Sequence, residues 1–139
     1  MRKIFLIGLI IAGFVITSCN DSAVEPDPTE MYLYKSYDST GIKIVEGWIT
    51  INFTDSLGIL GEWELKKVGN SENIGPQVGT GKLVGSKHGD LTFVELNPQF
   101  IDNNLILTGT LEQGKYVGEW QYISYVGITN YGTFEANKK

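Results

Sequence analysis

Apolar and polar side chains alternate along most of this chain, which indicates β-strands. The alternation is clearest at Ile49, Ile51 and Phe53, which stand at every second position. It is repeated where Trp63 and Leu65 stand between charged residues. Such segments continue to the end of the chain, separated by Gly, Asn, Asp and Ser. We expect strands over residues 31–37, 42–54, 59–68, 78–87, 91–96, 105–112, 115–126 and 128–136.

These segments predict an all-β domain whose strands are joined by short connections. Beyond residue 19, no window of eleven or more residues has the apolar spacing of a helix. Short connections favour antiparallel pairing of consecutive strands, and closure of the sheet removes its exposed edges. The 17 glycines among 139 residues fit the tight coiling of a small barrel. We therefore predict a small up-and-down antiparallel β-barrel of about eight strands over residues 30–139.

A short motif recurs within this region. The triplet Gly-Glu-Trp occurs at residues 61–63 and again at 118–120. Each copy precedes a strand that contains a glycine two residues before an apolar side chain, Gly-Lys-Leu at 81–83 and Gly-Thr-Phe at 132–134. Two related four-strand halves would give this pattern, and so would chance similarity between hairpins. The sequence leaves both interpretations open.

The beginning of the chain follows a different pattern. Arg2 and Lys3 precede an apolar run over residues 4–16, and Thr17 and Ser18 then lead to Cys19. A positive start, an apolar centre and small residues at the end are the parts of a secretory signal peptide. The apolar run is shorter than the roughly 20 residues that a membrane-spanning helix needs. We predict a helical signal peptide over residues 1–18.

The end of this segment, Ile-Thr-Ser-Cys at residues 16–19, resembles the lipobox of bacterial lipoproteins. The resemblance implies that signal peptidase II cuts before Cys19 and that this thiol becomes a diacylglyceryl thioether. It also implies that the new amino group can be acylated, for example with palmitate. Cys19 is the only cysteine in the chain and therefore has no disulfide partner in it. An ordinary signal peptide with an incidental cysteine is the alternative.

Residues 19–29 are expected to form the acylated cysteine and a flexible acidic tether. This stretch contains Asp21, Glu25, Asp27 and two prolines, with little apolar surface to bury. Asn20 stands where an aspartate would favour retention in the inner membrane in enteric-type sorting. We therefore expect a lipid-anchored protein of the bacterial cell envelope, at the outer membrane, facing the periplasm or the cell surface.

Charge and residue counts exclude several classes of function. The chain has a net charge of −5, and removal of Arg2 and Lys3 makes it more acidic. An acidic surface argues against nucleic acid as a partner. One histidine and no cysteine beyond Cys19 cannot supply a usual zinc site. We expect no metal and no cofactor, and a membrane contact that depends on the lipid anchor.

The sequence offers little for catalysis. His88 lies between Ser86 and Asp90 in a single turn, whereas a catalytic triad needs groups that converge from separate elements. Glu46 and Glu95 stand in otherwise apolar strands, and glycoside hydrolysis would need two carboxyl groups about 5–10 Å apart. We expect no catalytic residues. An envelope enzyme such as a carbohydrate-active hydrolase remains a second alternative.

Aromatic residues are the strongest remaining candidates for a binding role. Four are expected to point inward, where they either fill the barrel or line a ligand pocket: Trp63, Trp120, Tyr122 and Phe134. Four others are expected to lie on the outer surface as a contact patch for a protein or glycan: Tyr32, Tyr34, Trp48 and Tyr125.

The glycine-rich succession of strands with tryptophans at strand starts is similar to small ligand-binding barrels such as calycins, among them the lipocalins, and avidins. This is a likeness of architecture, from which function does not follow. Our first hypothesis is a non-catalytic envelope lipoprotein that binds or contacts a partner. The alternative is a calycin-like carrier of a small apolar ligand. A cavity lined by Trp63 and Trp120 would favour the carrier, and a packed interior would favour the contact module.

Overall fold

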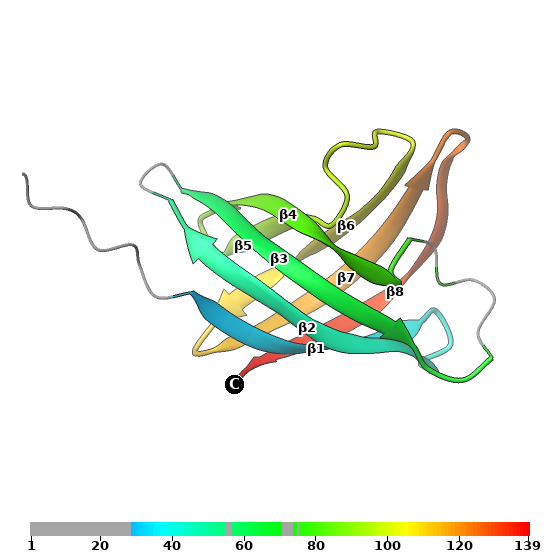
Figure 1. Ribbon diagram of the computed structural model, residues 1–139, viewed down its shortest axis with the longest axis horizontal. Coiled ribbons are helices and arrows are strands. Elements are labelled where there is room, and N and C mark those ends of the chain that lie inside the picture. The colour runs from blue at the N-terminus through cyan, green and yellow to red at the C-terminus, as the bar shows by residue number, and fades with distance from the viewer. Residues whose placement is uncertain (1–28, 55–56, 71–73, 75) are drawn as a thin grey trace, which may run out of the picture.

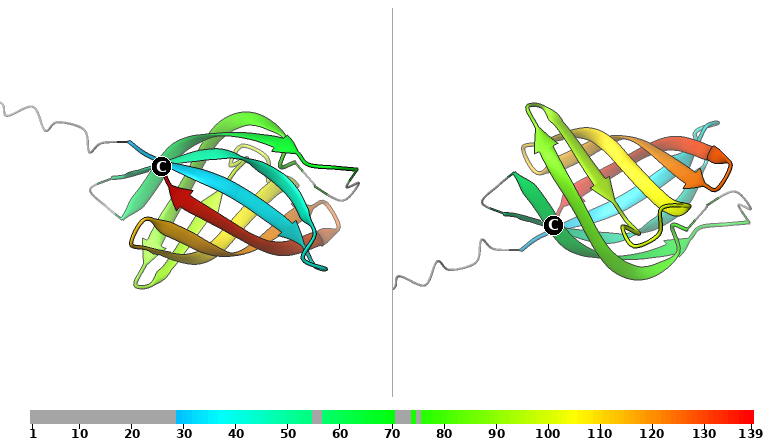
Figure 2. Two further views of the ribbon diagram at one scale, coloured as in Figure 1. Left: turned by 90° about the horizontal axis from the view of Figure 1, so that it is seen from below. Right: turned by 90° about the horizontal axis from the view of Figure 1, so that it is seen from above.

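Eight antiparallel strands follow one another around a closed barrel in the computed structural model (Figure 1). It describes residues 29–54, 57–70, 74 and 76–139. The strands are β1 (Glu30–Asp38), β2 (Lys43–Phe53), β3 (Gly58–Lys67), β4 (Gly79–His88), β5 (Leu91–Glu95), β6 (Asn103–Glu112), β7 (Lys115–Ser124) and β8 (Gly127–Lys138). Each pairs with its neighbours in sequence, and β1 also pairs with β8 (Figure 2).

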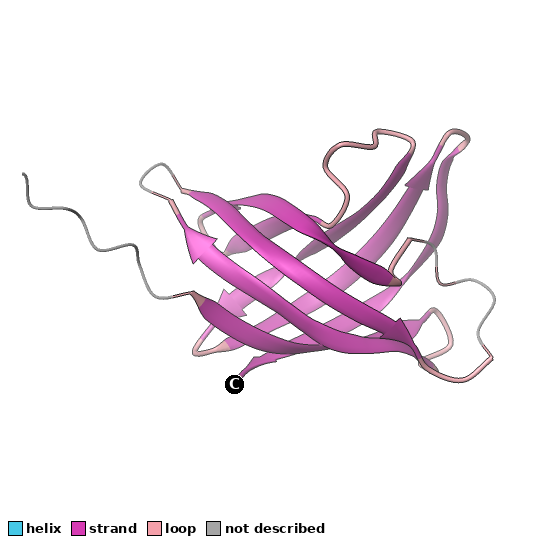
Figure 3. Ribbon diagram, in the orientation of Figure 1, coloured by secondary structure: helices cyan, strands magenta, loops and turns pink. Residues whose placement is uncertain are grey.

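The predicted fold class is confirmed. All eight expected strands are present, and the described part of the chain contains no helix (Figure 3). The ends differ by a few residues; β7 ends at Ser124, and Tyr125 and Val126 form the turn into β8. The signal peptide, Cys19 and most of the tether lie outside the described residues.

The two ends of the barrel differ in their connections. At one end, which we call the turn end, β1 begins and β8 finishes, and the connections β2–β3, β4–β5 and β6–β7 are short. Gln113 and Gly114 both have positive φ values, 49° and 75°, as a two-residue type I′ hairpin requires. At the opposite end, which we call the loop end, lie the connections 39–42, 68–78, 96–102 and 125–126 (right side of Figure 1).

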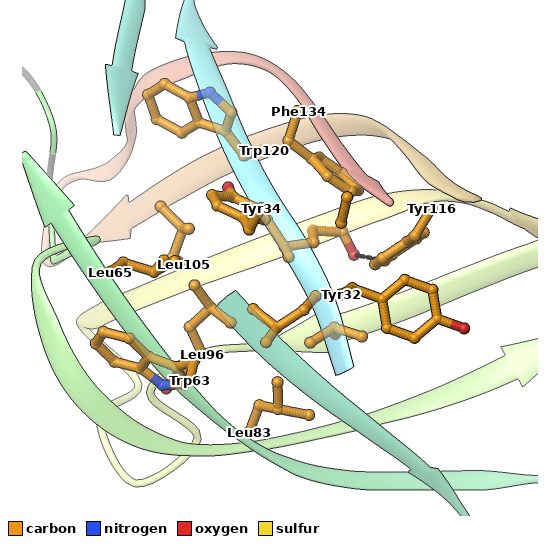
Figure 4. Packing of buried hydrophobic residues seen from close by; sticks show 14 of the residues in the cluster. Tyr32, Tyr34, Trp63, Leu65, Leu83, Leu96, Leu105, Tyr116, Trp120 and Phe134 are labelled. Carbon is orange, nitrogen blue, oxygen red and sulfur yellow. Dashed lines mark hydrogen bonds between the residues drawn. The ribbon is translucent and has the colours of Figure 1, made fainter. Parts of the chain in front are cut away.

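Inward-facing side chains fill the barrel. The buried rings of Tyr34 and Phe134 stack with their centroids 5.8 Å apart, and Tyr116 packs edge-on against Phe134 at 4.7 Å. The Tyr116 hydroxyl lies within hydrogen-bonding distance of the carbonyls of Thr92 and Leu107, at 3.0 and 3.1 Å. Aliphatic side chains from the other strands surround these rings (Figure 4). The Tyr116 hydroxyl is thus satisfied inside the core, whereas the buried Thr92 hydroxyl has no hydrogen-bond partner among the described residues.

A buried glutamine closes the interior at the loop end. Gln77 reaches in from the β3–β4 connection and is fully buried. Its side-chain oxygen accepts hydrogen bonds from the hydroxyls of Ser36, at 2.8 Å, and Tyr34, at 3.3 Å. Its amide nitrogen donates to the carbonyl of Ile74 at 2.8 Å. The connection is thus fixed to β1 by hydrogen bonds inside the barrel.

The two Gly-Glu-Trp triplets occupy equivalent places in the barrel. Trp63 on β3 lies opposite Gly81 of β4, and its indole nitrogen donates to the carbonyl of Leu96, just past β5, at 2.6 Å. Trp120 on β7 lies opposite Gly132 of β8, and its indole nitrogen donates to the carbonyl of Tyr37 on β1 at 2.8 Å. In each half, a tryptophan passes over a glycine of the next strand and bonds to the strand beyond.

The two glycines leave the space that these rings need. A Cβ atom at Gly81 would lie 2.7 Å from the indole nitrogen of Trp63, and one at Gly132 would lie 2.8 Å from that of Trp120. The apolar residues two positions later, Leu83 and Phe134, are both buried. The two halves, β1–β4 and β5–β8, thus repeat the same arrangement of tryptophan, glycine and apolar residue.

Candidate functional site

Three of the four aromatic residues expected to point inward are buried in the core. Trp63, Trp120 and Phe134 are nearly inaccessible to solvent (Figure 4). Tyr122 is partly buried and packs against the core, and its hydroxyl donates to the side-chain oxygen of Asn103 at 3.0 Å. The hollow that reaches Trp120 opens at the loop end and is not lined by Trp63. The rings therefore fill the barrel.

The expectation that Tyr32 and Tyr34 lie on the outer surface is wrong. They are only 2% and 1% exposed, and both belong to the core. The alternation along β1 is ambiguous because Leu33, the neighbour of both, is also apolar, and it is Leu33 that faces outward. The hydroxyls of both tyrosines have partners: Tyr32 donates to Glu30 in a partly buried hydrogen bond, and Tyr34 donates to Gln77 in a buried one.

The other two residues of the expected surface patch lie in separate places. Trp48 is half-buried on the outer wall of β2, in a hollow of about 620 Å³ beside Met31 and Leu60. Tyr125 is 89% exposed in the turn between β7 and β8, at the loop end. The structure therefore does not bring the four predicted contact residues together.

Apolar side chains are exposed side by side at the loop end. Asn103 pairs with Ser124, so the β5–β6 connection and the β7–β8 turn leave the barrel next to each other (upper right of Figure 1). We call their exposed apolar residues the rim patch: Phe100, Ile101, Tyr125, Val126 and Ile128. Exposed apolar residues grouped in this way are typical of contact surfaces. Ile101, at 91% exposure, was not predicted because it stands in a loop without periodicity.

A hollow of about 560 Å³ opens beside the rim patch, where β1 meets β8. Its wall includes Asp38 from β1, Lys43 from β2, and Asn130 and Tyr131 from β8, and Trp120 forms part of it. β1 and β8 come from opposite ends of the chain, so the hollow exists only because these two strands pair. We call it the mouth hollow.

A second hollow, of about 530 Å³, lies on the other side of the same wall. It is lined by Glu119, Gln121 and Thr133, whose side chains come from β7 and β8. Four residues line both hollows: Asp38, Ser39, Thr40 and Tyr131. We call the second hollow the side hollow. The four shared residues form a ridge between it and the mouth hollow.

Asp38 holds the turn over residues 38–42 in its conformation. Its Oδ1 accepts hydrogen bonds from the Thr40 hydroxyl at 2.7 Å and from the backbone N–H groups of Thr40 and Ile42 at 2.9 and 3.0 Å. The Thr40 hydroxyl, followed by the Ile42 backbone N–H, lowers the pKa of Asp38 from its ordinary value. The carboxylate is therefore ionised at neutral pH. All three hydrogen bonds are accepted by Oδ1.

The carboxylates that the sequence singled out have structural partners. Glu46 forms ion pairs with Lys43 at 2.9 Å and Lys66 at 3.3 Å, and the hydrogen bond from Lys43 is the first cause that lowers its pKa. Glu95 accepts a hydrogen bond from the Asn104 amide at 2.8 Å. His88 lies at the turn end, with its ring 6.3 Å from that of Phe93. The three residues are not gathered into one site.

Two further features are absent from the described part of the chain. Its His, Cys, Asp and Glu residues form no group of three that could hold a metal ion. Its residues also include no helix long and apolar enough to cross a membrane.

Comparison of the chain with protein-family models, with curated proteins and with solved structures finds no match.

Proposed function

We propose that this chain is a non-catalytic lipoprotein of the bacterial cell envelope, anchored at the outer membrane through Cys19, which binds its partner with the loop end of the barrel. The lipobox-like residues 16–19 support the anchor. Ten residues, 20–29, separate Cys19 from Glu30, where β1 begins. Two or three acyl chains hold a protein at a membrane stably, whereas one does not.

One observation carries the choice of the loop end. The chain enters the barrel at Glu30, at the turn end, while the rim patch and both hollows lie at or next to the opposite end. An anchor attached through the residues before Glu30 is joined to the turn end and leaves the loop end free. A partner in the envelope can therefore reach the exposed side chains of Ile101 and Tyr125.

The alternatives draw less support from the described residues. A carrier of a small apolar ligand would need space within the barrel, where Tyr34, Phe134 and Tyr116 pack against one another. An envelope hydrolase would need two carboxyl groups facing a common cleft. Glu46 and Glu95, the two candidates, are instead held by lysines and by an asparagine.

Lipid labelling tests the anchor. Cells that express the full chain are fed a palmitate analogue that can be detected after gel electrophoresis. We expect the wild-type chain to be labelled, and the Cys19→Ala chain to remain unlabelled and to keep its signal peptide. Inhibition of signal peptidase II should have the same effect on processing. Labelling that persists in Cys19→Ala would refute the anchor.

Photo-crosslinking in living cells tests the binding surface. A photoreactive residue replaces Ile101 in the rim patch or, as the matched control, Leu91, an exposed apolar residue at the turn end. We expect a discrete crosslinked product from position 101 only, and its loss when Val126→Ser is added. No product from position 101, or the same product from both positions, would contradict the proposal.

A further inference from the structure

We propose that the mouth hollow and the side hollow together bind a neutral oligosaccharide, which lies across the ridge formed by residues 38–40 and Tyr131. This inference deepens the proposed function, because it names a class of ligand for the loop end. It rests on the shape, the polar groups, the aromatic rings and the charges of the two hollows.

The shape fits a chain-like ligand. The hollows, of about 560 and 530 Å³, are each within the range of roughly 300–1,000 Å³ that is usual for small-molecule sites. They share Asp38, Ser39, Thr40 and Tyr131 as a common wall. A molecule with several linked rings can therefore occupy both hollows, with its middle over the ridge.

The polar groups match a ligand rich in hydroxyls. Hydroxyl and amide side chains both donate and accept hydrogen bonds, as sugar hydroxyls do. Thr129 and Asn130 line the mouth hollow, and Gln121 and Thr133 line the side hollow. Asp38 adds an acceptor on the ridge, because its bonds to Thr40 and Ile42 use only Oδ1.

Aromatic rings supply the apolar part of the site. Tyr131 lines both hollows and is 63% exposed, so its ring is accessible to a ligand on the ridge. Trp120 contributes to the mouth hollow, although most of its indole is buried. Sugar rings carry C–H groups on their faces, and an amphipathic ring such as that of Tyr131 contacts such a face while its hydroxyl stays in water.

The charges favour a neutral ligand over an anionic one. Asp38 and Glu119 place carboxylates on the ridge and in the side hollow. Among the described residues that line the two hollows, Lys43 is the one cation, and it pairs at 2.9 Å with Glu46, which also pairs with Lys66 at 3.3 Å. A phosphorylated sugar or a uronic acid would meet the two carboxylates of Asp38 and Glu119 and a single lysine that is already paired.

Nuclear magnetic resonance titration tests the proposal. The full chain, ¹⁵N-labelled and purified from cells in a zwitterionic detergent that has no sugar headgroup, is titrated with hexasaccharides. The panel contains β-1,4-glucose, α-1,4-glucose, xylose, mannose and N-acetylglucosamine oligomers. We expect at least one to shift the backbone amide signals of residues 38–43 and 129–133, with saturation at micromolar to millimolar concentration.

Two aromatic variants make the test specific. Tyr131→Ala should weaken binding of that hexasaccharide by about tenfold or more. Phe53→Ala is the matched control, because Phe53 is also an exposed aromatic residue but lies at the turn end and lines neither hollow. Hexasaccharides that leave these amides unshifted, or equal weakening by the two variants, would overturn the proposal.

The outcome can be separated from that of the proposed function. If no hexasaccharide binds but the crosslink from position 101 forms, the sugar site is refuted and the proposed binding module stands. If a hexasaccharide binds but the wild-type chain is not labelled with lipid, the anchor is refuted and the sugar site stands.

Discussion

The indole nitrogen of Trp120 donates a hydrogen bond of 2.8 Å to the backbone carbonyl of Tyr37, and thereby joins β7 to β1 across the inner side of β8. Trp63 makes the corresponding bond to the carbonyl of Leu96. Both rings are buried. Each therefore contributes apolar burial and a satisfied polar group at the same place.

Trp120→Ala should lower the free energy of unfolding by about 3–5 kcal/mol, because it empties a large volume in a packed core. Trp120→Phe should have a smaller effect, because it keeps a ring but loses the bond to Tyr37. Urea unfolding followed by circular dichroism measures both changes. Trp48→Ala, on the outer wall, should cost less than Trp120→Ala. A loss below about 1 kcal/mol for Trp120→Ala would be incompatible with a core ring.

Gly81→Ala should destabilise the barrel by about 1–3 kcal/mol through overpacking against Trp63. A Cβ there would lie 2.7 to 2.9 Å from three atoms of that indole. The same substitution should cost less in a Trp63→Phe background, because the smaller ring leaves more space. A double-mutant cycle measures this coupling. An additive result would mean that Gly81 is needed for another reason.

Gln77→Leu should cost about 1–3 kcal/mol, because it leaves the hydroxyls of Tyr34 and Ser36 buried without their acceptor. Adding Ser36→Ala to Gln77→Leu should recover part of this loss, since one unpaired hydroxyl is then removed. Val78→Ala, at the exposed neighbouring position, serves as the control and should change little. Equal unfolding midpoints for Gln77→Leu and Val78→Ala would show that the buried hydrogen bonds do not stabilise the connection.

Stability should fall as the pH rises above about 9, where tyrosines begin to ionise in the unfolded chain. Burial raises the pKa of Tyr34 and Tyr116 in the folded barrel. A raised folded-state pKa gives stability that is complete below the unfolded-state pKa and is lost as the pH increases beyond it. Urea midpoints measured from pH 8 to pH 11 show the slope.

Tyr34→Phe and Tyr116→Phe should each flatten that alkaline slope, because each removes one group that ionises only after unfolding. The comparison is made within each variant, so that the lost hydroxyl contacts do not affect it. If both variants keep the wild-type slope, the alkaline loss comes from groups other than these two tyrosines.

Alternation and turn residues were enough to predict the barrel, because a strand with one buried face repeats every second residue. They failed at β1, where Met31, Tyr32, Leu33 and Tyr34 are apolar or aromatic in succession. Whether Tyr32 and Tyr34 or Met31 and Leu33 face inward depends on the neighbouring strands. The burial of Gln77 also has no signal in a polar segment, since it depends on two hydroxyls about forty residues away.

The hollows at the loop end could not be predicted for a related reason. Asp38 and Tyr131 stand far apart in the sequence and meet because β1 pairs with β8. A pattern read along the chain identifies each strand but not which loops become neighbours after closure. The anchor at Cys19 is a local motif and so can be proposed from sequence alone; it stays a prediction until it is labelled.

The position of Glu30 at the turn end also determines how the molecule would bear force. A pull between the residues before Glu30 and a partner at the loop end acts along β1, which is hydrogen-bonded on both sides, to β2 and to β8. Ladder hydrogen bonds run across the strands, so such a pull must shear two rows of them at once instead of opening them one after another. With the proposed anchor and loop-end partner, the closed barrel would resist detachment of its domain under tension.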